Sequence, residues 1–203
     1  PMEVDWVGMP TRVLALTAMV VLLWRLNRYR RISKGACGRC GRDGSASVDR
    51  RSLAVWAAGL SAIPAIGYAA LKLHWAFGGT IGLTGPDVFA DVEPWTPGFA
   101  DTAVMAVIGI GLAVAMATRR PRLPRWMLLT PALIGCALLL PVAVLGTAGL
   151  IIGAFDSTEG LGLQTWVGWF VYSCFTAWGA GLAIVTAEYH YGTRGGCRVC
   201  GRA

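Results

Sequence analysis

The sequence predicts an all-α fold, an integral membrane bundle of five transmembrane helices with a small cysteine-rich unit attached. The chain of 203 residues is 55% hydrophobic and only 14% charged, whereas soluble domains carry about 25% charged residues. Its apolar residues form runs of membrane-spanning length, which is about 20 residues for a helix. Two near-identical C-x-x-C-G-R knuckles, one beginning at Cys37 and the other at Cys197, lie outside these runs.

The predicted bundle covers residues 2–187 and contains five apolar segments: Val7–Trp24, Leu53–Phe77, Phe99–Thr118, Trp126–Phe155 and Gly162–Ala187. Proline predicts a kink in the second segment, at Pro64, and in the fourth, at Pro131 and Pro141. Stretches rich in glycine and alanine predict close packing between helices. Tryptophans near the segment ends predict anchoring at the membrane interface: Trp6, Trp24, Trp56, Trp75, Trp95, Trp126 and Trp166.

The charges predict the orientation. The first loop, the third loop and the C-terminal tail are basic through Arg25, Arg28, Arg30, Arg31, Lys34, Arg39, Arg42, Arg50, Arg51, Arg119, Arg120, Arg122, Arg125, Arg194, Arg198 and Arg202. The opposite side is acidic through Glu3, Asp5, Asp87, Asp91, Glu93, Asp101, Asp156 and Glu159. By the positive-inside rule, we expect a multi-pass inner-membrane protein with its N-terminus outside and its C-terminus cytoplasmic. The net charge of +7 follows this topology, so we expect no nucleic-acid partner.

The two knuckles, within residues 35–42 and 195–203, predict a metal site. Paired C-x-x-C motifs present four thiolates tetrahedrally, so Cys37, Cys40, Cys197 and Cys200 are the expected ligands of a structural Zn²⁺ ion. The glycine after each second cysteine permits a tight turn that points backbone amides at the sulfurs. Cytoplasmic thiols stay reduced, which favours metal over disulfides. The alternatives are a redox-active cysteine pair and four unrelated free cysteines.

A second group of candidates lies at the outer end of the second segment. Lys72 and His74 fall within or at the edge of the hydrocarbon, where ionisable residues tend to face a cavity or a partner. With Asp87 and Asp101 they are the candidate catalytic or ligand-binding residues of an outward-facing pocket. The alternatives are structural: Lys72 can snorkel to the surface, and Asp101 at a helix start is commonly a cap.

The stretch His74-Trp75-Ala76-Phe77-Gly78-Gly79 carries a resemblance. It is similar to the His/Trp-Ala-x-Gly-Gly segment of a family of small bacterial membrane proteins with several spans and no assigned function. The similarity covers roughly residues 53–187, the last four predicted spans, and leaves out the cysteine knuckles. It implies the helical membrane fold and marks His74 and Trp75 as residues of interest.

Three functions are compatible with these features, and the sequence does not decide whether the chain is an enzyme. The first is an accessory or structural subunit, held together by zinc, whose basic cytoplasmic face binds anionic lipid headgroups or a protein partner. The second is an enzyme or carrier that takes a lipophilic small molecule into the pocket around His74. The third is a thiol–disulfide oxidoreductase, although quinone-linked versions keep their active cysteines on the outer side.

Overall fold

The computed structural model describes residues 21–22, 24–41, 51–89, 93, 96, 99–119, 123–153, 162–193, 195, 197 and 199–201. The chain divides into two compact units. One comprises residues Pro1–Val48 with Arg194–Ala203, and the other residues Asp49–Thr193. Residues 7–20 of the first predicted span lie outside the described residues, as do Phe155 at the end of the fourth and the acidic residues Glu3, Asp5, Asp91, Asp156 and Glu159.

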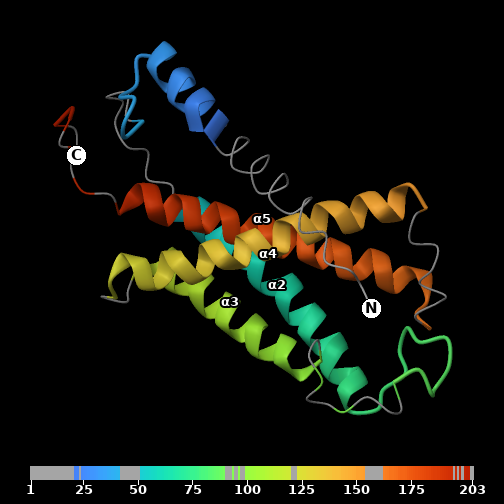
Figure 1. Ribbon diagram of the computed structural model, residues 1–203. Coiled ribbons are helices and arrows are strands. Elements are labelled where there is room, and N and C mark those ends of the chain that lie inside the picture. The colour runs from blue at the N-terminus through green and yellow to red at the C-terminus, as the bar shows by residue number, and fades with distance from the viewer. Residues whose placement is uncertain are drawn as a thin grey trace, which may run out of the picture. The chain divides into compact units, whose positions relative to one another are not determined.

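The larger unit is a helical bundle (Figure 1). Its helices are α2 (Arg51–Ala76), α3 (Ala100–Thr118), α4 (Arg125–Ile151) and α5 (Thr165–Gly192). Within the described part of the chain, these four are long and apolar enough to cross a membrane. They match four of the five predicted spans, although α5 continues beyond the predicted end at Ala187.

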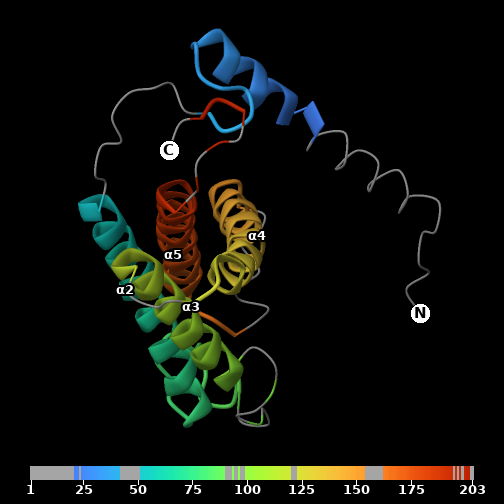
Figure 2. The same cartoon turned by 90° about the vertical axis from the view of Figure 1, so that its left-hand side faces the viewer.

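Helix α5 is the centre of the bundle. It packs against α2, α3 and α4, and Figure 2 shows it between α2 and α4. Helix α4 contributes Leu128 to the core, but many of its large aliphatic side chains are exposed: Leu133, Ile134, Leu138, Val142, Val144, Leu145 and Ile151. A water-soluble bundle would not leave such a continuous apolar surface exposed, so this face fits contact with lipid.

Close packing of α2 on α5 follows from small residues. The buried positions of α2 recur every three or four residues: Ala54, Ala57, Ala58, Ser61, Ala65, Tyr68, Leu71 and Trp75. Because those in its first half are small, the two backbones approach there. A Cβ atom on Gly181 of α5 would lie 2.6 Å from the backbone N of Ser61 and 2.7 Å from the carbonyl O of Ala57. The predicted packing through small residues is therefore observed.

One end of the bundle is basic. Helix α5 ends there, and arginines flanking the α3–α4 connection approach its last carbonyl groups. Arg125 donates a hydrogen bond of 3.1 Å to the carbonyl O of His190, and the guanidinium of Arg119 lies against Gly192. Cations stabilise the negative end of a helix dipole. Arg119 and Arg125, which are among the basic residues that predict the topology, thus also cap the C-terminal end of α5.

The opposite end of the bundle is acidic. An isolated antiparallel bridge between Leu83 and Leu163 joins the segment after α2 to the segment before α5. Asp87, Glu93 and Asp101 belong to this end, since they lie between α2 and the first turn of α3. Apart from Lys72 at the acidic end and Glu188 at the basic end, the described charges of the bundle are thus segregated as the sequence predicts.

The tryptophans divide into two groups. Trp56, Trp126 and Trp166 are exposed near helix ends, in agreement with interfacial anchoring. Trp75 is only 4% exposed, so the anchoring prediction is wrong for this residue. Its indole N–H donates to the carbonyl O of Ile81 at 2.8 Å, and its ring packs against Phe89 with 5.4 Å between centroids. A satisfied N–H makes burial of the ring favourable.

The smaller unit contains helix 24–33 and the two knuckles. The sequence predicts that the first span ends at Trp24, whereas residues 24–33 are helical. Arginine is a good helix former, so a basic segment need not break the helix. The helix stops at Gly35, whose φ of 69° is unfavourable for other residues. The N–H of Ala36 then bonds to the carbonyl O of Arg31 at 2.9 Å, which leads the chain into the first knuckle.

Candidate metal centre and the residues around His74

The four predicted ligands lie together in the smaller unit. The Sγ atoms of Cys37, Cys40, Cys197 and Cys200 all lie within 4.8 Å of one another. Those of Cys40 and Cys200 are 3.5 Å apart although the two residues are 160 positions apart in the chain. All four cysteines are reduced and half-buried. The cluster could therefore hold a metal ion.

The two knuckles have the same backbone geometry. The N–H of Gly41 bonds to the carbonyl O of Cys37 at 2.7 Å, and the N–H of Gly201 bonds to that of Cys197 at 2.8 Å. Both glycines have a positive φ, 77° at Gly41 and 67° at Gly201. A residue with a side chain would be strained there. The predicted tight glycine turn is therefore confirmed in both knuckles.

Backbone amides favour the thiolate at the first cysteine of each knuckle. The N–H groups of Cys40 and Arg39 lower the pKa of Cys37 to about 6. Those of Cys200 and Val199 lower the pKa of Cys197 in the same way. Hydrogen bonds to the charged form stabilise it, and the thiolate is the form that binds metals. The backbone geometry of the knuckles thus favours the thiolate form of the cysteines, which is the form that binds a metal cation.

The spacing of the sulfurs suits tetrahedral coordination. With Zn–S bonds of about 2.3 Å, the sulfurs of a tetrahedral site are separated by about 3.8 Å. The observed separations, 3.5 Å between the sulfurs of Cys40 and Cys200 and at most 4.8 Å for all four, lie close to this value. Such a set of four soft ligands fits zinc or iron better than magnesium or calcium.

Arginines of helix 24–33 pack against the first knuckle, a feature that sequence reasoning missed. A Cβ atom on Gly41 would lie 3.2 Å from Nε of Arg31, and one on Gly38 would lie 3.7 Å from Nε of Arg28. Their spacing and the preceding helix could have indicated this, because positions three apart share a helix face. The arginines bring positive charge close to the thiolates.

His74 closes the turn after α2. Its Nε2 accepts a hydrogen bond of 3.3 Å from the N–H of Ile81. Its ring lies so close to Gly79 that a Cβ atom at this position would collide with it, which explains the second glycine of the pair. The N–H of Gly79 bonds in turn to the carbonyl O of His74 at 2.8 Å. The imidazole therefore has a polar partner, as expected for a ring at membrane depth.

Lys72 is surrounded by aromatic rings. Its ammonium lies 4.9 Å from the ring centroid of Phe99, 5.2 Å from that of Trp75 and 5.9 Å from that of Tyr68. Each distance permits a cation–π interaction. The carboxylate of Asp101 adds an electrostatic attraction. The lysine is thus stabilised by its own neighbours.

The described residues around these groups form a packed cluster. Its buried members are Leu71, Trp75, Leu83, Phe99 and Val167. The segment after α2 is tied to the start of α5 by hydrogen bonds from the N–H of Thr84 to Gly162, 2.9 Å, and from the N–H of Gln164 to Gly82, 2.8 Å. Asp87 is exposed in this segment. Asp101 lies in the first turn of α3, where a carboxylate suits the helix dipole.

Replacing His74 with alanine should lower the free energy of unfolding by roughly 1 kcal/mol, because it removes the acceptor for the Ile81 N–H. Unfolding of the detergent-solubilised protein, followed by circular dichroism, measures this. Phe77→Ala is the control: it lies in the same turn but is 85% exposed, so we expect a change within about 0.5 kcal/mol. Equal effects of the two substitutions would contradict a specific role for the imidazole.

Comparisons with known proteins assign this chain to no family. The chain matches no protein-family model, no curated protein and no solved structure. The resemblance carried by residues 74–79 therefore stays a prediction.

Proposed function

We propose that this chain is a small inner-membrane protein with a non-catalytic role, an accessory or structural subunit whose terminal segments are joined by a structural Zn²⁺ ion. The observation that carries the proposal is the gathering of four Sγ atoms within 4.8 Å from two matching knuckles. Four thiolates fill a tetrahedral zinc site and leave no position for a reacting water molecule. The ion would therefore serve structure, by linking the segment after helix 24–33 to the segment after α5.

The surroundings of the cysteines support a resident metal rather than a redox pair. A zinc ion with four thiolates carries a net charge of −2, which nearby arginines offset. Arg28 and Arg31 pack against the first knuckle. Both knuckles present their first sulfur to backbone amides in the same way, as expected where two matching knuckles contribute to one four-sulfur site.

The outer end of the bundle supports a non-catalytic reading. His74 bonds to a backbone N–H of its own turn, and Lys72 is engaged by three rings. These groups stabilise the local fold. The alternative, an enzyme or carrier for a lipophilic molecule that uses Lys72, His74, Asp87 and Asp101, stays a prediction.

Elemental analysis tests the proposal directly. We expect one zinc ion per chain in protein purified without added metal, since structural zinc sites bind with apparent free energies of about 10–16 kcal/mol. Inductively coupled plasma mass spectrometry gives the metal identity and the ratio to protein. Iron in place of zinc, or less than stoichiometric metal together with four titratable surface thiols, would contradict the proposed ion.

The proposed orientation places the knuckles in the cytoplasm. A reporter enzyme fused after Ala203 should then be active only as a cytoplasmic reporter, and a cysteine introduced at Glu93, which is exposed, should react with an impermeant maleimide in intact cells. Arg119, at the opposite end of the bundle, provides the matched site and should stay unlabelled after replacement with cysteine. Reversed labelling of the two positions would overturn the orientation.

A further inference from the structure

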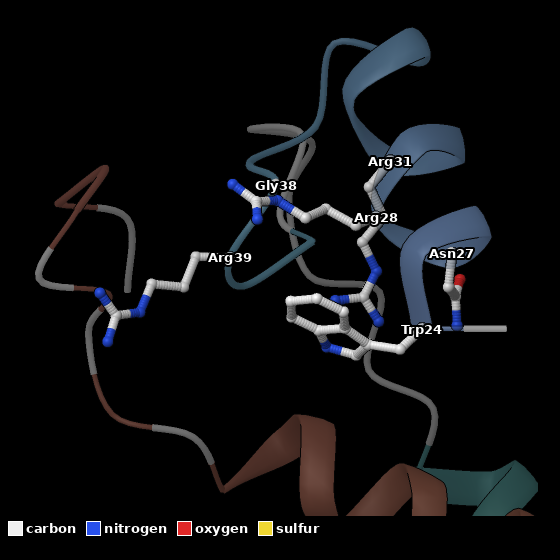
Figure 3. A pocket seen from close by; sticks show the side chains of 6 residues that line it. All are labelled: Trp24, Asn27, Arg28, Arg31, Gly38 and Arg39. Atoms are coloured by element: carbon white, nitrogen blue, oxygen red, sulfur yellow. The ribbon is translucent and has the colours of Figure 1, made fainter. Parts of the chain in front are cut away.

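A cavity of about 480 Å³ lies beside helix 24–33. Its lining residues, shown in Figure 3, are Trp24, Asn27, Arg28, Arg31, Gly38 and Arg39. The first four share one face of the helix, because residues three, four and seven positions apart lie above one another. The last two belong to the first knuckle. The cavity is thus built entirely within the smaller unit.

The lining groups suit an oxyanion with several oxygens. Three of the six lining residues are arginines, and none of these described residues is acidic. A guanidinium presents its N–H donors in a planar fork that matches a phosphate group. Asn27 and Trp24 can contribute further N–H donors. The guanidinium of Arg28 lies over the ring of Trp24, 5.9 Å from its centroid, and an anion bound beside the arginines would lower the repulsion between their positive charges.

The same helix has the features of a membrane-interface segment. Its opposite face carries the exposed residues Leu26 and Tyr29, and Trp24 is also exposed. A helix with apolar residues on one face and arginines on the other lies at the boundary between headgroups and acyl chains. Tryptophan and tyrosine favour the same depth. The phosphates within reach of such a helix are those of lipids.

We infer that the cavity lined by Trp24, Asn27, Arg28, Arg31 and Arg39 binds the phosphate group of an anionic lipid headgroup. This inference deepens the lipid contact of the membrane role proposed above and rests on it. Free inorganic phosphate shares the chemistry and is the other source to be distinguished. A different role for the arginines, neutralisation of the cysteine cluster alone, is an outcome of the test.

Binding of dioctanoyl phosphatidic acid to the purified full chain in detergent, measured by native mass spectrometry, tests the site. Arg28→Gln should weaken binding roughly tenfold, because it removes charge-assisted hydrogen bonds. Arg30→Gln is the matched control: it removes the same charge from the same helix, but Arg30 does not line the cavity. We expect less than about a threefold loss from it, as for an exposed charge. Equal losses would overturn the site.

Two further measurements distinguish lipid binding from binding of free phosphate and from neutralisation of the cysteine cluster. Inorganic phosphate at the same concentration as the lipid should not displace it, because the lipid adds apolar contacts; displacement at equal concentration would overturn the lipid as the ligand. Zinc content is measured on the same samples. Loss of zinc from Arg28→Gln, with no selective loss of lipid binding, would assign the arginine to the cysteine cluster and overturn the inference. The wild-type protein could also prove to contain no zinc while Arg28→Gln still binds the lipid more weakly than Arg30→Gln does. This result would support the lipid site and contradict the zinc proposal.

Discussion

Replacing Cys197 with serine should weaken zinc binding by at least roughly a hundredfold, because one of four thiolates supplies about a quarter of a binding free energy of 10–16 kcal/mol. The alcohol that replaces the thiol does not ionise at neutral pH and binds zinc poorly. Competition with a chromogenic chelator measures the affinity. The segment around Gly195, which follows α5, should then be cut faster by protease, since the link to a segment 160 residues away is lost.

Cys174→Ser is the control for this substitution. Cys174 is buried among apolar residues of the bundle and is not among the clustered thiols, so its variant should keep stoichiometric zinc. The bundle of the Cys197→Ser variant should retain its helical circular dichroism, since α2–α5 pack through contacts of their own. Full zinc affinity in Cys197→Ser would contradict the four-cysteine site.

The sequence predicts the coarse features of this protein well, because they depend on local patterns. Apolar length fixes α2–α5, and the charged segments between them fix which ends are basic or acidic. The knuckles could be predicted for a similar reason. The glycine after Cys40 and the glycine after Cys200 each permit a tight turn in which backbone amides point at the first sulfur of the knuckle, and two such turns make a four-thiolate set.

The features that the sequence did not predict depend on side-chain packing between distant elements. The aromatic surroundings of Lys72 combine Tyr68 and Trp75 of α2 with Phe99 at the start of α3. Tyr68 and Trp75 lie four residues before and three residues after Lys72 on α2, so the helical spacing places both on its face, whereas nothing in the spacing brings the ring of Phe99 there. The burial of Trp75 likewise follows from the carbonyl group of Ile81, whose position is set by the turn after α2.

Helix 24–33 shows a further limit of sequence reasoning. A cluster of arginines after a span indicates topology and says nothing about secondary structure. Only the helical register places Arg28 and Arg31 on one face, with Arg30 outside the lining of the cavity. One set of charges can therefore act both as an orientation signal and as a binding surface.

Replacing Gly181 with alanine should destabilise the bundle by about 2 kcal/mol, within the range that overpacked sites lose. The added methyl group would lie 2.6 Å from the backbone N of Ser61, 2.7 Å from the carbonyl O of Ala57 and 3.0 Å from the carbonyl carbon of Leu60. All three are backbone atoms of α2, which cannot rotate away as a flexible side chain can. Helices α2 and α5 must therefore separate, and the contacts around Gly181 are lost.

Gly111→Ala is the matched control, because a Cβ atom at Gly111 of α3 meets nothing within 4 Å. Its unfolding free energy should stay within about 0.5 kcal/mol of the wild type or rise slightly, since alanine is the better helix former. Unfolding in mixed micelles with increasing SDS, followed by circular dichroism, measures both variants. Equal stability of Gly181→Ala and Gly111→Ala would show that α2 and α5 do not meet through this glycine. A larger loss for Gly181→Val than for Gly181→Ala is expected, because each additional methyl group forces the two backbones further apart.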